Sequence, residues 1–169
     1  MTKRKIRGLT AFIMGLLLMS ATQVGAETMK YRVVLFHTKV EAIKIVDAEG
    51  HIVGIYESTG LATLETKEVG VVSQKGTFDY IKGTGTHDGY SRLTFEDGST
   101  IDIKFEGITT PNPKAKGSLF ESTSVLITQG TGQYAGIKGA GSYTGRRVVP
   151  AIGAGAELYT DMILRYTLP

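Results

Sequence analysis

The sequence contains no cysteine and no tryptophan among its 169 residues. Without cysteine, the chain cannot form disulfides, thiolate zinc sites or iron–sulfur clusters, and it has no thiol nucleophile for catalysis. A chain of this length can instead be stabilised by a single hydrophobic core. The sequence therefore predicts one domain that folds without covalent cross-links.

A long helical pattern is also missing beyond residue 26. Apolar residues recur there at every second position, and glycines and turn residues separate these stretches, which is typical of β-strands with one buried face. Eight strands are expected, at residues 31–39, 51–56 with an extension toward 64, 69–73 together with 77–82, 90–96, 99–107, 118–128, 142–149 and 157–168.

The clearest of these strands is 99–107. Ile101, Ile103 and Phe105 alternate there with charged residues, which predicts one face toward a core and one toward solvent. Asp97-Gly98 comes directly before it and is typical of a tight hairpin turn.

Eight strands joined by short turns predict an all-β domain, and antiparallel strands of this kind either stack as two sheets or close into a barrel. We expect an eight-stranded antiparallel β-barrel over residues 27–169, because closure removes exposed sheet edges. An outer-membrane barrel would need tall apolar bands with aromatic girdles. The short apolar face of strand 99–107 and the lack of tryptophan argue against that class.

Residues 1–26 have the three parts of a secretory signal peptide. A basic start at 3–7 precedes an apolar run at 9–19, and Val24-Gly25-Ala26 supplies small residues for cleavage. The apolar run is shorter than the roughly 20 residues that span a bilayer, so an uncleaved anchor is the less favoured alternative. We expect a periplasmic or extracellular protein with no stable membrane insertion after cleavage.

The net charge of +3 comes from this leading segment. Four of the 19 basic residues lie in 1–26, which has no acidic residue, so 27–169 holds 15 basic and 16 acidic residues, a net charge of −1. A nearly neutral domain gives no indication of binding to nucleic acid or to an anionic membrane surface.

The segment 130–145, GTGQYAGIKGAGSYTG, contains six glycines and raises the question of phosphate binding. A dinucleotide loop needs a helix after its glycines, and a Walker loop needs Ser or Thr after Gly-Lys. Here Gly139-Ala140-Gly141 follows Lys138 at once, which disfavours both loops. We expect instead a single tight helical turn that places Tyr134 as a plug in one end of the barrel.

Residues 127–145, ITQGTGQYAGIKGAGSYTG, resemble the strand–GTG-aromatic–Ala-Gly–strand segment of the allene oxide cyclase and dirigent barrel superfamily. This resemblance implies a lipocalin-like (calycin-like) barrel of eight antiparallel strands around a ligand-sized lumen. In the plant members it implies an isomerase that cyclises an unsaturated fatty-acid epoxide, or a protein that steers the coupling of phenoxy radicals. No catalytic residue of those proteins is carried over to this chain.

Function in such a barrel depends on inward-facing side chains. Glu121 is a candidate catalytic residue, because it shares a strand face with Val125 and Ile127, and an acid among apolar side chains is suited to proton transfer. The alternative orientation turns Phe120 and Leu126 inward and leaves Glu121 in solvent.

Tyrosine side chains would give the lumen apolar walls with hydroxyl groups, although ordinary strand packing is the alternative. The candidate ligand-binding tyrosines are Tyr31, Tyr80, Tyr143 and Tyr166. Arg146 is a candidate partner for a ligand carboxylate at the barrel mouth. Adjacent strand residues point to opposite faces, so at most one of Arg146 and Arg147 has this role.

The three histidines, His37, His51 and His87, show no metal-ligand spacing. No metal and no cofactor are expected. His37 shares a face with Val33 and Leu35, which is typical of a core or rim histidine.

Three functions remain open on these grounds. The first is a secreted barrel that binds a small apolar or aromatic molecule in its lumen. The second is an enzyme that uses the same lumen, an isomerase, cyclase or lyase without a metal, since positioning alone accelerates such reactions. The third is a solid barrel that forms a homo-oligomer.

The signal segment leads to a direct test. Mass spectrometry of the exported protein should find Glu27 at the N-terminus, because cleavage is expected after Ala26. Recovery of the intact chain from the periplasm or medium would contradict this prediction.

Overall fold

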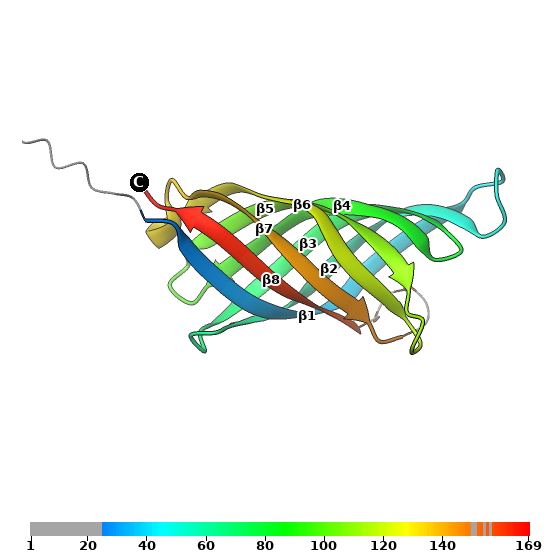
Figure 1. The fold of residues 1–169 in the computed structure, drawn as a ribbon, viewed down its shortest axis with the longest axis horizontal. Helices are drawn as coiled ribbons and strands as arrows, with labels where there is room; N and C mark the ends of the chain where they lie inside the picture. Colours follow the sequence, from blue (N-terminus) through cyan, green and yellow to red (C-terminus); the bar gives the residue numbers. More distant parts are fainter. Residues whose placement is uncertain (1–24, 150–151, 154, 156) are drawn as a thin grey trace, which may run out of the picture.

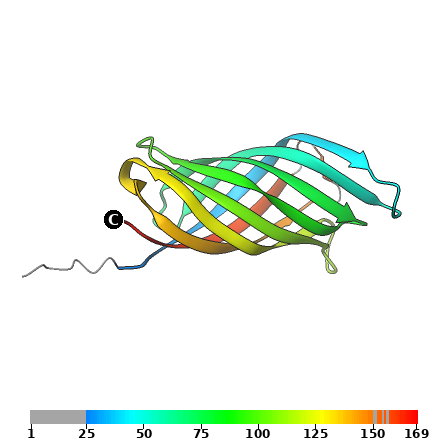
Figure 2. The same cartoon turned by 90° about the horizontal axis from the view of Figure 1, so that it is seen from above.

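The computed structural model describes residues 25–149, 152, 153, 155 and 157–169, which form a closed barrel of eight antiparallel strands (Figure 1, Figure 2). The prediction of an all-β, eight-stranded antiparallel barrel is confirmed. In the described part of the chain, no helix has the length and apolar character of a membrane span. The elements are β1 (Glu27–Lys44), β2 (His51–Leu64), β3 (Val69–Ile81), β4 (Thr84–Phe95), β5 (Thr100–Pro111), β6 (Ser118–Thr131), the 3₁₀ helix η1 (Gly132–Tyr134), β7 (Lys138–Arg147) and β8 (Glu157–Thr167).

The sheet closes because β1 pairs on both of its edges. Val33 lies opposite Ala62 of β2 on one side and opposite Thr160 of β8 on the other. Each remaining strand pairs with its sequence neighbours, so every connection is a hairpin between adjacent strands. The eight strands thus enclose one interior.

Three strands begin earlier than the sequence pattern predicted, and one of them is β1, which starts at Glu27 rather than at 31. β4 starts at Thr84 rather than at 90, and β7 starts at Lys138 rather than at 142. In the first residues of β4 and β7, glycine takes several of the positions. Since glycine carries no side chain, the alternation of apolar and polar residues is not visible there.

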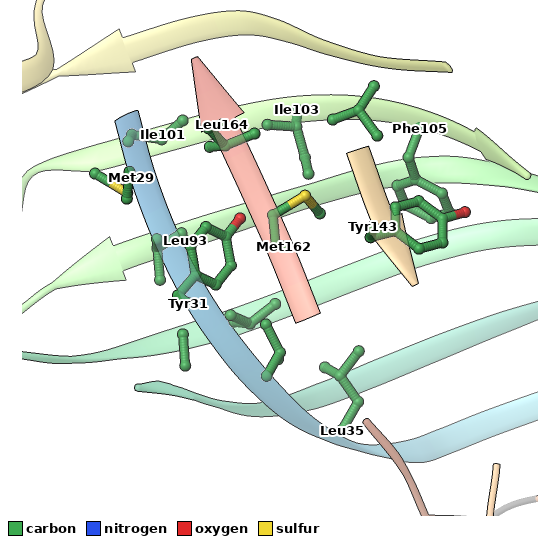
Figure 3. Close-up of a cluster of buried hydrophobic side chains, with 14 of the residues drawn as sticks. Met29, Tyr31, Leu35, Leu93, Ile101, Ile103, Phe105, Tyr143, Met162 and Leu164 are labelled. Atoms are coloured by element: carbon green, nitrogen blue, oxygen red, sulfur yellow. The ribbon is translucent and has the colours of Figure 1, made fainter. Parts of the chain in front are cut away.

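The inward face of β5 is the one that the sequence predicted. Ile101, Ile103 and Phe105 are 1%, 3% and 2% exposed, and Figure 3 shows them packed with Met162 and Leu164 of β8. This belt fills the middle of the barrel with apolar side chains and so supplies much of the hydrophobic stabilisation.

The side of strand β6 that faces the interior changes along its length. Phe120 is buried near its start, but Val125 is buried further on, so the inward parity changes from even to odd. The cause is a β-bulge: Gly107 of β5 pairs with Ser122 and Glu106 pairs with Ser124, which leaves Thr123 without a partner in β5. One extra residue shifts the alternation, and neither of the two orientations expected from sequence holds for the whole strand.

The glycine-rich segment closes one end of the barrel. After β6 it forms η1 and then re-enters the sheet as β7, with no α-helix. Gly132 has φ +58, a conformation that residues with a side chain rarely adopt. The ring of Tyr134 is buried there, with its centroid 4.7 Å from that of Phe95, and Ile137 is buried beside it.

The face assignment of β5 can be measured. Ile103→Ala should lower the free energy of unfolding by about 2–5 kcal/mol, because it leaves a cavity in the packed belt. Asp102→Ala should cost about 1 kcal/mol or less, because it removes only a pair with Arg92 on the outer surface. Thermal or urea unfolding in which Asp102→Ala is the more damaging change would contradict the assignment.

Candidate functional site

The interior contains a cavity toward the end opposite η1, with about 60 Å³ available to the centres of water-sized molecules. That is room for about four to six waters, so most of the barrel is filled by side chains. Apolar and aromatic residues make one part of the wall: Tyr31, Val33, Leu35, Val72, Ile103, Phe105, Phe120, Ile152, Leu158 and Met162. Polar residues make the rest: His37, Tyr56, Gln74, Tyr80, His87, Ser91, Tyr143, Arg147 and Thr160.

Four polar side chains from four strands form one hydrogen-bonded chain in this region. The Tyr143 hydroxyl lies 2.6 Å from Nε2 of His87, and Nδ1 of His87 lies 2.9 Å from Oγ1 of Thr109. Thr109 donates its hydroxyl proton to the Tyr80 oxygen at 2.9 Å. Because that proton is used, Thr109 accepts from Nδ1–H of His87, and Nε2 then accepts from Tyr143.

The direction of this chain leaves one donor free. The Tyr80 oxygen accepts a hydrogen bond from the Thr109 hydroxyl, so the O–H group of Tyr80 can itself donate a hydrogen bond to a molecule in the cavity. The chain also fixes the neutral His87 ring as the tautomer protonated on Nδ1.

Gly107 makes room for the pair at the centre of this chain. A side chain at this position of β5 would meet the Tyr143 hydroxyl, and its Cβ would lie 2.7 Å from Nε2 of His87. Such an approach is too close for any other residue, so glycine is required where the tyrosine and the histidine meet.

A second histidine lies on the other side of the cavity. Nδ1 of His37 is 2.8 Å from the Ser58 hydroxyl, and its ring packs edge-on against Tyr56 with centroids 5.3 Å apart. Nε2 of His37 is buried and has no hydrogen-bond partner among the described residues. The ring therefore keeps one polar atom available to the interior.

Arg147, the last residue of β7, brings a positive charge into the barrel. It is 4% exposed, its guanidinium lies over the Phe120 ring at 5.3 Å, and its buried Nε has no hydrogen-bond partner among the described residues. Burial lowers the pKa of Arg147 below its usual value, and the neighbouring Tyr80 and Tyr56 oppose this shift. Arginine nevertheless stays protonated at neutral pH.

Burial holds the other ionisable groups of the cavity neutral. It lowers the pKa of both His37 and His87 to about 4, and the charge of Arg147 acts in the same direction. Burial also raises the pKa of Tyr31 and Tyr143 above its usual value. At neutral pH, Arg147 is therefore the one charged residue among the described residues that line the cavity.

The structure brings three of the four candidate tyrosines together. Tyr31, Tyr80 and Tyr143 line the cavity. Tyr166 lies at the other end of the barrel, where it packs against Tyr134 and its hydroxyl donates to the Glu27 carboxylate at 2.9 Å. That end holds the buried Tyr134 ring and is separated from the cavity by the apolar belt.

Two other candidates have side chains on the outer surface of the barrel, so neither has the role in the lumen or at its mouth that was considered for it, and for Glu121 the solvent-facing alternative holds. Glu121 precedes the bulge in β6, where the even positions face inward, so its side chain is exposed on the outer face. Arg146 is also exposed, with its guanidinium 5.0 Å from the centre of the Tyr159 ring. Both line a shallow outer groove, and Arg147 takes the inward position that was expected for Arg146.

Sequence reasoning named Arg146 ahead of Arg147 and did not place His87 in the lumen, although the alternation bears on both residues. Tyr143 was expected to face inward, and Arg147 lies four residues later in the same strand, so it shares that face. His87 shares the face of Leu93 and Phe95, but it belongs to the part of β4 that the glycines obscured.

No metal centre is apparent in the described ranges, where no three histidine, aspartate or glutamate side chains come together as ligands. His51 lies on the outer surface, where its Nε2 is 2.8 Å from Asp79, so it does not join the two histidines of the cavity.

Neither protein-family models nor curated protein sequences match the chain.

The buried histidines should make stability depend on pH. In the unfolded chain both imidazoles bind a proton near pH 6.5, but in the barrel they do so only near pH 4. Between these values the unfolded state binds more protons, so the free energy of unfolding falls as the pH decreases. The melting temperature should drop more from pH 7.5 to pH 4.5 in the wild type than in a His37→Gln, His87→Gln double variant.

The comparison removes the effect of the carboxylates, which titrate in both proteins. A His51→Gln variant is the control outside the lumen: hydrogen bonds with Asp47 and Asp79 raise the pKa of His51, so its loss should not reduce the drop. An equal drop in the wild type and the double variant would contradict the neutral state of the two buried rings.

Proposed function

We propose that the protein is an exported barrel that binds one small, largely apolar or aromatic molecule in its lumen. The observation that carries this proposal is the cavity itself, with apolar side chains on one part of its wall and polar groups on the other. Small-molecule sites typically combine an apolar lining with a few convergent polar groups. Within the cavity, Tyr80 O–H and Nε2 of His37 are available to orient such a molecule.

The size of the cavity limits the ligand. The volume open to the centres of water-sized molecules is about 60 Å³. This space suits a compact molecule, or one end of a longer molecule whose other end stays in the mouth of the barrel. The buried belt of Ile103, Phe105 and Met162 and the aromatic residues around Tyr134 fill the η1 end of the barrel. The ligand would therefore enter from the opposite end, which carries Arg147.

Catalysis in the same lumen is the second candidate. The 2.6 Å hydrogen bond between Tyr143 and His87 joins a neutral imidazole to a hydroxyl, which is an arrangement suited to moving a proton. The resemblance of residues 127–145 to the allene oxide cyclase and dirigent superfamily is consistent with an isomerase or cyclase, and it supports the same lumen as the place of binding.

A lumen-filling variant tests binding. Ser91→Leu places a larger apolar side chain on the cavity wall, and Tyr90→Phe is the matched control because Tyr90 faces outward on the same strand. With p-cresol as the probe, we expect the melting temperature of the wild type and of Tyr90→Phe to rise, since a ligand of the native state stabilises it. Ser91→Leu should show a much smaller rise.

The outcomes separate the candidates. Equal shifts in Ser91→Leu and the wild type would place binding outside the lumen and contradict the proposal, as would no shift with p-cresol or with a series of small phenols and alcohols. Recovery of the bound compound unchanged by NMR would favour binding, whereas its conversion, lost in His87→Gln, would favour catalysis.

A further inference from the structure

We propose that the lumen ligand is an organic monoanion whose carboxylate is held by Arg147 and His37. This inference rests on the proposed lumen binding and adds the chemical class of the ligand. It follows from the charge of the interior, the unused hydrogen-bond donors and the apolar wall that faces them.

The first observation is an unpaired buried cation. Arg147 is 4% exposed, and among the described residues no carboxylate forms an ion pair with it. The remaining residues of the chain, 1–24, 150, 151, 154 and 156, include no aspartate or glutamate. A buried charge is strongly unfavourable unless it is paired. Tyr80 and the Phe120 ring compensate it only in part because both are neutral, which favours a counter-charge from another molecule.

The second observation is a set of unused donors at the same cavity. Nε of Arg147 and Nε2 of His37 are both buried without a partner in the described chain. The Ser58 hydroxyl can donate to Nδ1 of His37, 2.8 Å away, which leaves the proton of the neutral ring on Nε2. Arg147 and His37 then both present N–H groups, and an anion accepts from both.

The third observation concerns the charge and shape of the ligand. The cavity offers a single positive charge, because both of its histidines are neutral at pH 7. A carboxylate carries one negative charge, and its two oxygens match the fork of a guanidinium group. The apolar body of the ligand would then lie against Leu35, Val72 and Phe105.

The test compares two probes of the same length that differ in charge. Calorimetric titration of the wild type should show hexanoate binding about 10- to 100-fold more tightly than hexan-1-ol, as expected for hydrogen bonds to a charged group. Arg147→Met should lose this preference. Arg146→Met is the matched control, because Arg146 is the next residue but faces outward, and it should keep the preference.

The outcomes distinguish the ligand class from lumen binding itself. If both probes bind the wild type equally, the lumen binds small molecules but the carboxylate inference is overturned. If neither probe binds, lumen binding and the inference both fail. Equal loss of preference in Arg146→Met and Arg147→Met would also overturn the inference, because the outward arginine does not reach the cavity.

A measurement on the wild type keeps the test decisive even if Arg147→Met fails to fold. NMR of carboxyl-labelled hexanoate should show that the bound carboxyl group stays ionised to a lower pH than the free acid, because a neighbouring cation favours the charged form. A bound carboxyl group that takes up its proton at a higher pH than the free acid would overturn the inference.

Discussion

Closure of the sheet is the constraint on which the rest of the structure depends. Because β1 pairs with both β2 and β8, every second side chain of eight strands is directed into one interior. An eight-stranded barrel is narrow enough for side chains of opposite strands to meet. His87 and Tyr143 are 56 residues apart in sequence, yet their polar atoms are 2.6 Å apart across the lumen.

The interior has different chemistry at its two ends. At the η1 end, Tyr134 packs against Phe95 and Tyr166, and the apolar belt of Figure 3 follows. At the other end, polar side chains from β1, β3, β4, β5 and β7 meet around the cavity. Such groups are costly to bury unless they bond to one another, and the chain from Tyr143 to Tyr80 meets this requirement for four of them.

The same burial decides the electrostatics of the lumen. It favours the neutral form of each histidine and tyrosine, but arginine has too high a pKa to lose its proton. One positive charge is thus retained beside neutral groups, and its Nε finds no partner among the described residues. The π face of Phe120 partly stabilises the positive charge of Arg147. A carboxylate would stabilise that charge more strongly.

The sequence by itself determined the number of strands and the inward face of β5, because alternation at period two depends only on neighbouring residues, and the short turns indicated that neighbouring strands run antiparallel. It also indicated that Tyr31, Tyr80 and Tyr143 share the interior. The tertiary structure alone decided the inward face of β6, because the bulge at Thr123 arises from pairing with β5. It likewise decided that His87, Thr109, Tyr80 and Tyr143 form one hydrogen-bonded chain, because contacts across a lumen depend on the register of all eight strands, and no local pattern in the sequence encodes that register.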